Sequence, residues 1–149
     1  MKRMAAIYDI HGNLPALEAV LLEISQAKVD QIVVGGDVIA GPMPRETLAR
    51  LLNLDIPVQF IQGNADREIV AQVAGEDAGA VPEHVLAIVR WVAQQLEPEQ
   101  VQMLANWPPT YQVEVEGIGE VLFCHATPRN DTDVFTRLTP ETPLLPIFA

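Results

Sequence analysis

Five side chains that can bind cations each lie at or just beyond the end of a short apolar stretch of the chain. They are a mixture of carboxylate, imidazole and carboxamide groups: Asp9, His11, Asp37, Asn64 and His125. A carboxylate can bridge two cations, and oxygen ligands combined with imidazole suit Mn, Fe or Zn better than Ca. Two such ions about 3.5–4 Å apart can activate a water and hold both oxygens of an in-line displacement at phosphorus. These residue types are therefore typical of a metal centre that acts on phosphate.

The spacing of these residues indicates how the chain positions them. Asp9, Asp37 and Asn64 are separated by 28 and then 27 residues, and a β-α-β unit takes about 30. Two such units place parallel strands in one sheet, and ligand sites of open sheets lie at the carboxyl ends of the strands. We therefore expect these turns to converge. The expected buried strands cover residues 4–8, 31–34 and 57–61.

Leucine, isoleucine and valine recur at helical spacing between and after these strands. The expected helices are one that starts at Asn13 and Pro15, one over about 45–53, one over 84–96 and a shorter one opened by Pro98. The pattern from about 67 to 81 is weak and predicts a frayed helix or a loop. Alternation at 111–115 and the apolar run at 121–124 predict a hairpin, which brings His125 to a strand end.

Composition excludes several classes of protein. A chain of 149 residues predicts a single domain over 1–149. Nine basic against twenty acidic residues give a net charge of −11, so nucleic-acid binding through a basic surface is not expected. Cys124 is the only cysteine, which fits a reducing compartment. No membrane span and no secretory leader are expected, and we interpret the protein as cytoplasmic.

Four ordered motifs resemble the calcineurin-like metallophosphoesterase superfamily. They are Asp9-x-His11-Gly12-Asn13, Gly36-Asp37 with Gly41-Pro42, Gly63-Asn64-x-Asp66, and His125. Their order is that of the family, and they cover most of the chain, from residue 4 to 128. The chain is therefore similar to a bacterial member. The resemblance implies a layered α/β fold, a β-sandwich flanked by helices.

The resemblance also implies a role for each ligand. Asp9 and His11 would bind the first metal, Asp37 would bridge both, and Asn64 with His125 would bind the second. The two divalent ions would be Mn before Fe, Zn, Ni or Mg. A hydroxide held between them would attack phosphorus without a phosphoenzyme intermediate. The expected partner is a small phosphorylated substrate or a phosphoprotein.

Three further assignments concern polar residues near these ligands. By resemblance, Asp66 joins Asp37 and Asn64 as a catalytic residue, and Asn13 contacts a metal-bound oxygen or the substrate. From the sequence alone, Asp66 either caps the next helix or supports His125 or Asn64 from behind. His84 carries no spacing argument and is expected in solvent.

The chain departs from the family pattern at two places. Ala65 stands where many members have a histidine that helps the leaving group depart, which favours diesters or better leaving groups. A late Gly-His-x-His motif is absent, and the residues from Thr139 to Ala149 end on apolar side chains. We therefore expect a fold that is incomplete at the C-terminus, with self-association possible through its apolar edge.

These departures leave competing functional hypotheses. The leading one is metal-dependent phosphoester hydrolysis by the full-length protein, with the present chain impaired. The alternative is a fragment or degenerate relative that binds a metal or a partner and hydrolyses nothing. Phosphatase chemistry with Asp9 as nucleophile is disfavoured, because His11 occupies the place of the second aspartate that such chemistry needs. Cys124 is expected to be a small buried hydrophobe and not a nucleophile.

Overall fold

The computed structural model describes residues 3–76 and 81–148. Its first sheet contains three parallel strands in the order β1-β2-β3. They are β1 (Met4–Ile7), β2 (Gln31–Val34) and β3 (Val58–Phe60). All four residues of β2 are buried, as expected for a central strand covered on both faces. The predicted parallel order, with all three strands ending at one edge, is confirmed.

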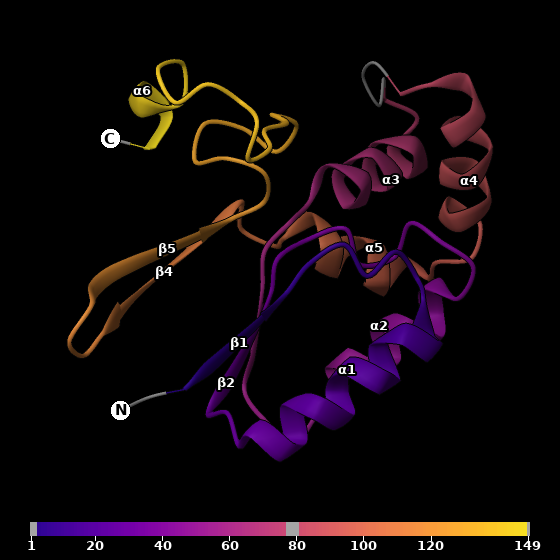
Figure 1. The fold of residues 1–149 in the computed structure, drawn as a ribbon. Coiled ribbons are helices and arrows are strands. Elements are labelled where there is room, and N and C mark those ends of the chain that lie inside the picture. The colour runs from indigo at the N-terminus through magenta and orange to yellow at the C-terminus, as the bar shows by residue number, and fades with distance from the viewer. Residues whose placement is uncertain (1–2, 77–80, 149) are drawn as a thin grey trace.

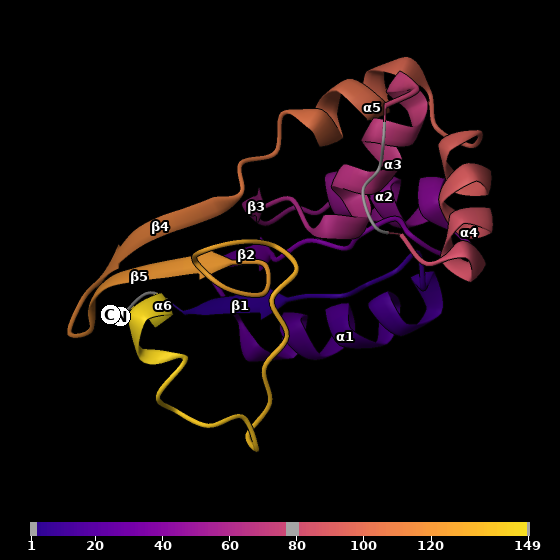
Figure 2. The ribbon, with the colours of Figure 1, turned by 90° about the horizontal axis from the view of Figure 1, so that it is seen from above.

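Five helices pack beside this sheet. They are α1 (Leu14–Ala27), α2 (Pro44–Leu52), α3 (Asn64–Ala74), α4 (Glu83–Ala93) and α5 (Pro98–Ala105). Figure 1 and Figure 2 show them gathered on one side of the molecule, with a β-hairpin on the other. The core between sheet and helices contains fully buried side chains such as Val34, Leu48, Ile69, Val92 and Leu104. The helical apolar stripes are therefore explained by packing.

The region from 67 to 81, where the sequence predicts a frayed helix or a loop, begins with a regular helix. Helix α3 runs without interruption to Ala74 and ends at Gly75, whose φ of 73° is the left-handed conformation that closes many helices. Its apolar face is narrow, and Ile69 is its fully buried large side chain. Tertiary packing against α4 and α5 compensates for that weak local signal. Residues 77–80 of the predicted loop lie outside the described part of the chain.

The predicted hairpin is confirmed as β4 (Thr110–Val115) and β5 (Gly119–Cys124), which pair antiparallel. Tyr111 and Phe123 face each other across it with ring centroids 6.2 Å apart. Side-chain contacts attach it to the parallel sheet, since Gln31 Nε2 donates to the Tyr111 hydroxyl at 3.2 Å. The hairpin therefore directs residue 125 toward the carboxyl edge of the first sheet.

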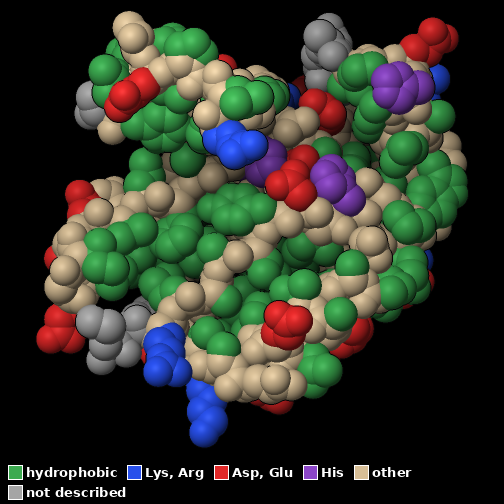
Figure 3. All heavy atoms as spheres, in the orientation of Figure 1, with side chains coloured by type: hydrophobic (Ala, Val, Ile, Leu, Met, Phe, Trp, Pro, Cys, Tyr) green, Lys and Arg blue, Asp and Glu red, His purple; other side chains and the backbone are tan. Residues whose placement is uncertain are grey.

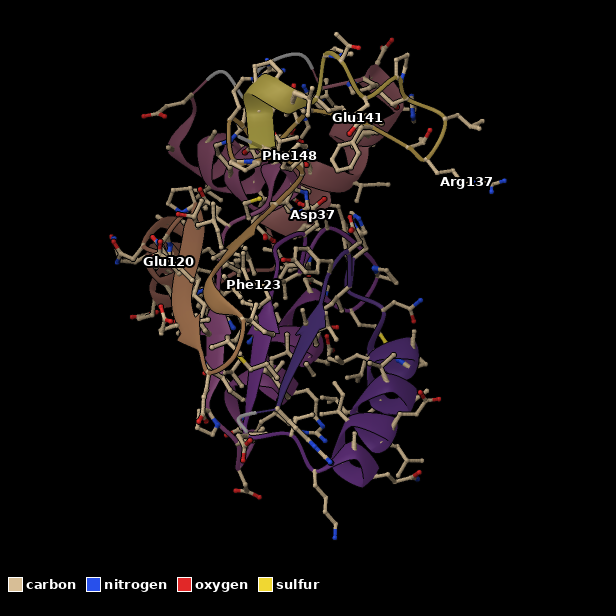
Figure 4. The ribbon with its side chains drawn as sticks, turned by 60° about the vertical axis from the view of Figure 1, so that its left-hand side comes forward. Asp37, Glu120, Phe123, Arg137, Glu141 and Phe148 are labelled. Atoms are coloured by element: carbon tan, nitrogen blue, oxygen red, sulfur yellow. The ribbon has the colours of Figure 1, made fainter. Side chains whose placement is uncertain are left out.

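A C-terminal segment, residues 126–148, follows the hairpin and contains the short helix α6 (Leu145–Phe148). Figure 4 places its labelled residues Arg137, Glu141 and Phe148 beyond Asp37, at the upper end of the molecule in that view. Phe135 packs edge-on against Phe148 at 5.4 Å. Apolar side chains nevertheless remain in solvent here, and Leu138 is 82% exposed. The segment is thus weakly covered by the described part of the protein.

Candidate metal centre

The loops after β1 and β2 are tied to each other by their backbones. Asp9 N–H donates to the Gly36 carbonyl at 3.2 Å, and His11 N–H donates to the Asp37 carbonyl at 2.8 Å. Gly12 N–H continues this pairing to the Val38 carbonyl at 2.8 Å. These hydrogen bonds hold the two ligand-bearing loops together and keep residues 9, 11 and 37 at a common edge of the sheet.

Strained backbone concentrates in the same place. Positive φ angles occur at Asp9 (53°), His11 (48°), Asp37 (55°) and Ala126 (61°), and among the described residues Lys28 is the other non-glycine case. Such conformations cost energy for side chains with a Cβ and persist where the surrounding structure holds them, commonly at functional sites. The clustering indicates that the fold maintains unfavourable backbone conformations in order to orient these side chains.

Glycine at two positions allows the loops to approach. A Cβ on Gly63 would overlap the carboxylate and the backbone nitrogen of Asp37. A Cβ on Gly36 would lie 2.6 Å from the Gly63 Cα and 2.9 Å from Nδ1 of His125, and its φ of 97° also disfavours a side chain. These glycines explain the Gly-Asp and Gly-Asn pairs of the sequence, because no larger residue fits between the ligand loops.

Asp37 lies at the centre of the arrangement. Its Oδ2 is 3.6 Å from Nε2 of His11 and 3.6 Å from Nε2 of His125. Its Oδ1 accepts a hydrogen bond from Ala65 N–H at 2.9 Å. Burial raises the pKa of the Asp37 carboxyl, and the charge of His125 and the bond from Ala65 oppose that rise. A buried carboxylate with one oxygen between two imidazoles is placed as a bridging ligand would be.

Both ring nitrogens of His125 have close polar neighbours. Its Nδ1 lies 2.8 Å from the Gly35 carbonyl, and since a carbonyl only accepts, Nδ1 carries a proton. Nε2 faces Oδ1 of Asn64 at 3.2 Å. The Asn64 amide is oriented by its NH₂ group, which donates to Glu68 Oε1 at 3.2 Å. In the tautomer with its proton on Nδ1, Nε2 and Asn64 Oδ1 would both be acceptors that could hold one cation.

The remaining predicted ligands complete one cluster. Asp9 Oδ1 is 3.6 Å from Nε2 of His11. The ligand atoms of Asp9, Asp37 and His125 all lie within 4.8 Å of one another. The structure thus gathers the other four predicted ligands around Asp37, and the donor chemistry fits divalent ions that accept oxygen and imidazole. Figure 3 shows histidine and acidic side chains together at a hollow between the C-terminal segment and the body of the protein.

Asp66 is placed differently from the expectation of a catalytic residue. Its side chain is fully buried, with 0% exposure. Oδ1 accepts from Val38 N–H at 2.9 Å and Ile39 N–H at 3.4 Å, and Oδ2 accepts from Gly63 N–H at 3.2 Å. Asp66 caps α3 from its third residue, because Gly63 is the N-cap residue and its N–H donates back to the Asp66 carboxylate. Among the described residues, no direct hydrogen bond from Asp66 to His125 or Asn64 is observed. Asp66 instead joins the loop after Asp37 to the start of α3, as a positioning residue.

The electrostatics of Asp66 follow from this burial. Desolvation, followed by repulsion from Asp37, raises the pKa of Asp66 to about 6, although its backbone hydrogen bonds favour the ionised form. Two neighbouring buried carboxyl groups therefore both disfavour their charged forms in the metal-free protein. Positive charge at the centre relieves both, which is a second feature that fits a cation there.

Asn13 has a structural task that the sequence also predicted. Its Oδ1 accepts from Ala16 N–H at 3.2 Å and caps α1. Asn13 lines a hollow of about 210 Å³ beside Asp9, together with Tyr8. Asp9 is the predicted ligand that borders this hollow, and a contact of Asn13 with substrate stays a prediction.

The largest hollow at the centre has a wall that the sequence analysis missed. A cavity of about 430 Å³ is lined by Asp9, Asp37, Asn64 and His125, and on its other side by Tyr8 and residues 131–135. The sequence signal was the run Asn130-Asp131-Thr132-Asp133, a group of turn-forming residues soon after a strand-end histidine. Its position over the cavity depends on tertiary contacts that no local pattern reveals.

Two minor predictions have mixed outcomes. His84 is exposed at the start of α4, as expected. Cys124 is half-buried where full burial was expected. Burial nevertheless raises the pKa of its thiol, so the unreactive protonated form is favoured.

Comparison with known proteins agrees with this geometry. Residues 2–142 match the family model of the calcineurin-like phosphoesterase superfamily domain. The chain belongs to the calcineurin-like phosphoesterase superfamily. An uncharacterized protein of Methanocaldococcus jannaschii is 27% identical over 139 residues, which are 93% of this chain and 54% of the relative.

Solved structures show the same fold. A hypothetical protein from Pyrococcus horikoshii superimposes with a TM-score of 0.83 at 22% identity, over 99% of this chain and 64% of that one. A metallophosphoesterase from Sphaerobacter thermophilus gives 0.64 at 29% identity, over 91% and 51%. A phosphoesterase from Escherichia coli gives 0.50 at 22% identity, over 89% and 64%. The chain thus spans between about half and two thirds of the length of these relatives.

These findings confirm the predicted family and the layered α/β fold. The matched family is one of calcineurin-like phosphoesterases, and the activity of this chain stays a prediction. The number and identity of the metal ions, the substrate and the site roles remain predictions. Among the described residues, no helix is both long and apolar enough to cross a membrane.

Proposed function

We propose that this chain carries the metal centre of a phosphoester hydrolase that uses two divalent ions, with Mn²⁺ preferred over Fe, Zn, Ni or Mg. The observation that carries the proposal is the position of Asp37. Its Oδ2 lies 3.6 Å from both His11 Nε2 and His125 Nε2, so one carboxylate would be within reach of an ion held by either imidazole. Asp9 would complete the ligands of one ion, and Asn64 those of the other.

Metal ions would supply positive charge for the phosphate and a water of lowered pKa. The chain's own residues supply the rest of the centre. Asp37 is held by Ala65 N–H and His125 by the Gly35 carbonyl, so both ligands are oriented before any ion binds. Rigid orientation of this kind is what a preorganised site requires. The phosphoester would occupy the cavity of about 430 Å³ above these atoms.

The proposed substrate class rests on position 65, where alanine replaces the histidine that many family members have. Ala65 is buried and offers its backbone N–H to Asp37, and Asp66 faces the backbone of residues 38, 39 and 63. Neither position presents a proton donor to the leaving group. We therefore propose diesters or esters with good leaving groups as preferred substrates, within the class of small phosphorylated molecules or phosphoproteins.

Hydrolysis of bis(p-nitrophenyl) phosphate with added Mn²⁺ tests the proposal. Asp37→Asn should lose turnover, because an amide cannot bridge two ions as a carboxylate does. Asp55→Asn is the matched control, since Asp55 is an exposed aspartate away from the cavity. Equal turnover of the two variants would contradict the proposal.

Calorimetric titration with Mn²⁺, combined with the turnover assay, distinguishes the hydrolase from the alternative, a metal- or partner-binding domain without turnover. Two bound ions per chain with release of p-nitrophenol support the hydrolase. Tight binding without any turnover supports the binding domain, and that outcome would place catalysis outside this chain. Absence of Mn²⁺ binding by the wild-type chain would refute both.

A further inference from the structure

The two elements that carry Asn64 and His125 are joined by a second contact beside the metal centre. Arg67, on the first turn of α3, donates through Nε to Asp131 Oδ2 at 2.7 Å and through Nη2 to Asp131 Oδ1 at 3.1 Å. This two-pronged geometry is the most directional ion pair that side chains form. It links residues 64 positions apart in the sequence. The contact between Asn64 and His125 joins the same two segments, over a separation of 61 positions.

Arg67 is rigidly related to Asn64. Both lie in the first turn of α3, where Arg67 N–H donates to the Gly63 carbonyl at 3.1 Å. Gly63 is in turn held by Asp66 at 3.2 Å. A displacement of Arg67 therefore moves the start of the helix, and Asn64 is its first residue.

Asp131 is related to His125 through a compact turn. Thr127 N–H donates to the Asn130 carbonyl at 3.1 Å, and Asn130 Oδ1 accepts from Thr132 N–H at 3.0 Å and Asp133 N–H at 2.7 Å. Thr127 Oγ1 also donates to Asp133 Oδ2 at 3.0 Å. These bonds tie residues 127–133 together, so a pull on Asp131 is transmitted toward the strand end at His125.

We propose that the Arg67–Asp131 pair is a clamp that holds Asn64 Oδ1 and His125 Nε2 at the separation a shared cation needs. The clamp deepens the function proposed above and rests on it for its purpose. Arg67 is thus a positioning residue for the second metal. The pair is also placed to hold residues 131–135 as one wall of the substrate cavity.

Partial exposure makes the proposal testable without unfolding the protein. The Arg67 and Asp131 side chains are 42% and 28% exposed, and ion pairs in contact with water contribute little to overall stability. Removal of the pair should therefore leave the fold intact and act on the local geometry. Arg50 offers a matched control, because its Nε lies 2.7 Å from Glu18 Oε1 between α1 and α2.

Titration with Mn²⁺ measures the effect on the second metal. Arg67→Ala should lower the affinity of one of two Mn²⁺ sites by roughly 10- to 100-fold, as loss of supporting contacts does, and leave the other unchanged. Arg50→Ala should bind as wild type. Arg67→Lys keeps the charge without the fork and should restore affinity in part. Asp131→Asn combined with Arg67→Ala should be no worse than either change alone.

The metal-free protein supplies a readout that does not depend on the proposed function. Imidazole ¹⁵N signals distinguish three histidines, His11, His84 and His125. Arg67→Ala should shift the His125 signals and leave those of exposed His84 in place, and Arg50→Ala should shift neither. Unmoved His125 signals, or equal weakening of both Mn²⁺ sites, would overturn the clamp. Wild-type protein that binds no Mn²⁺ would instead refute the proposed function, with the imidazole signals still deciding whether the pair positions His125.

Discussion

Replacement of Asp66 by asparagine tests whether burial raises the pKa of this carboxyl group in the metal-free protein. The pKa of Asp66 is about 6 in the folded protein, against an ordinary value of 3.8. Burial and the charge of Asp37 cause the rise, so the folded state favours the protonated form. A raised pKa contributes stability that is fully present below the unfolded value and is lost as the pH rises through the folded value.

The size of the effect follows from the shift. A rise of about two units corresponds to about 3 kcal/mol at 1.36 kcal/mol per unit. The free energy of unfolding of metal-free wild type, minus that of Asp66→Asn, should therefore fall by about 3 kcal/mol between pH 3, below the unfolded pKa, and pH 7. Bound Mn²⁺ should reduce this dependence, because it compensates the charge of Asp37.

Urea unfolding, followed by tryptophan fluorescence in the presence of EDTA, measures the difference at each pH. Asp133→Asn is the opposite control, because hydrogen bonds from Asn130, Arg129 and Thr127 lower the pKa of Asp133. Stability from Asp133 is present above the ordinary pKa and is lost as the pH falls, so its difference curve should have the reverse sign. A flat curve for Asp66→Asn would refute the argument from burial.

Two further perturbations test the close approach of the ligand loops and the exposed apolar segment. Gly63→Ala should cost about 1–3 kcal/mol of stability by overpacking and weaken Mn²⁺ binding in a calorimetric titration, because its Cβ overlaps Asp37. Gly75→Ala is the control: the φ of Gly75 is 73° and no atom lies within 4 Å of the added Cβ, so this change should cost about 1 kcal/mol of stability and bind Mn²⁺ as wild type. Equal Mn²⁺ affinities of the Gly63→Ala and Gly75→Ala variants would contradict the steric account. Leu138→Asp should reduce the self-association that we expect from the C-terminal segment, where Leu138 is 82% exposed, and unchanged light scattering at rising concentration would count against that expectation.

Much of the metal centre was predictable because its information is local. Each ligand lies at or just beyond the end of a short apolar strand, and parallel strands joined by helices bring their carboxyl ends to one edge. Asp9, Asp37 and Asn64 therefore had to converge once the strands were recognised. Recognition of the family rested on the same ordered motifs.

Other features depended on contacts between distant parts of the chain. Asp66 could be identified as a helix cap, but its bonds to Val38 and Ile39 require the packing of α3 against the loop after β2. Helix α3 itself has a weak apolar pattern and is completed by its neighbours.

The sequence alone determined the order of the polar residues at the strand ends and the edge of the sheet that they share, because strand ends and helical spacing are encoded over a few residues. Only the tertiary structure decided which other residues contact and orient these side chains. The Arg67–Asp131 pair, the wall at residues 131–135 and the burial that raises the pKa of Asp66 all arise from segments far apart in the chain. Their geometry depends on how complete elements pack, and no spacing rule contains that information.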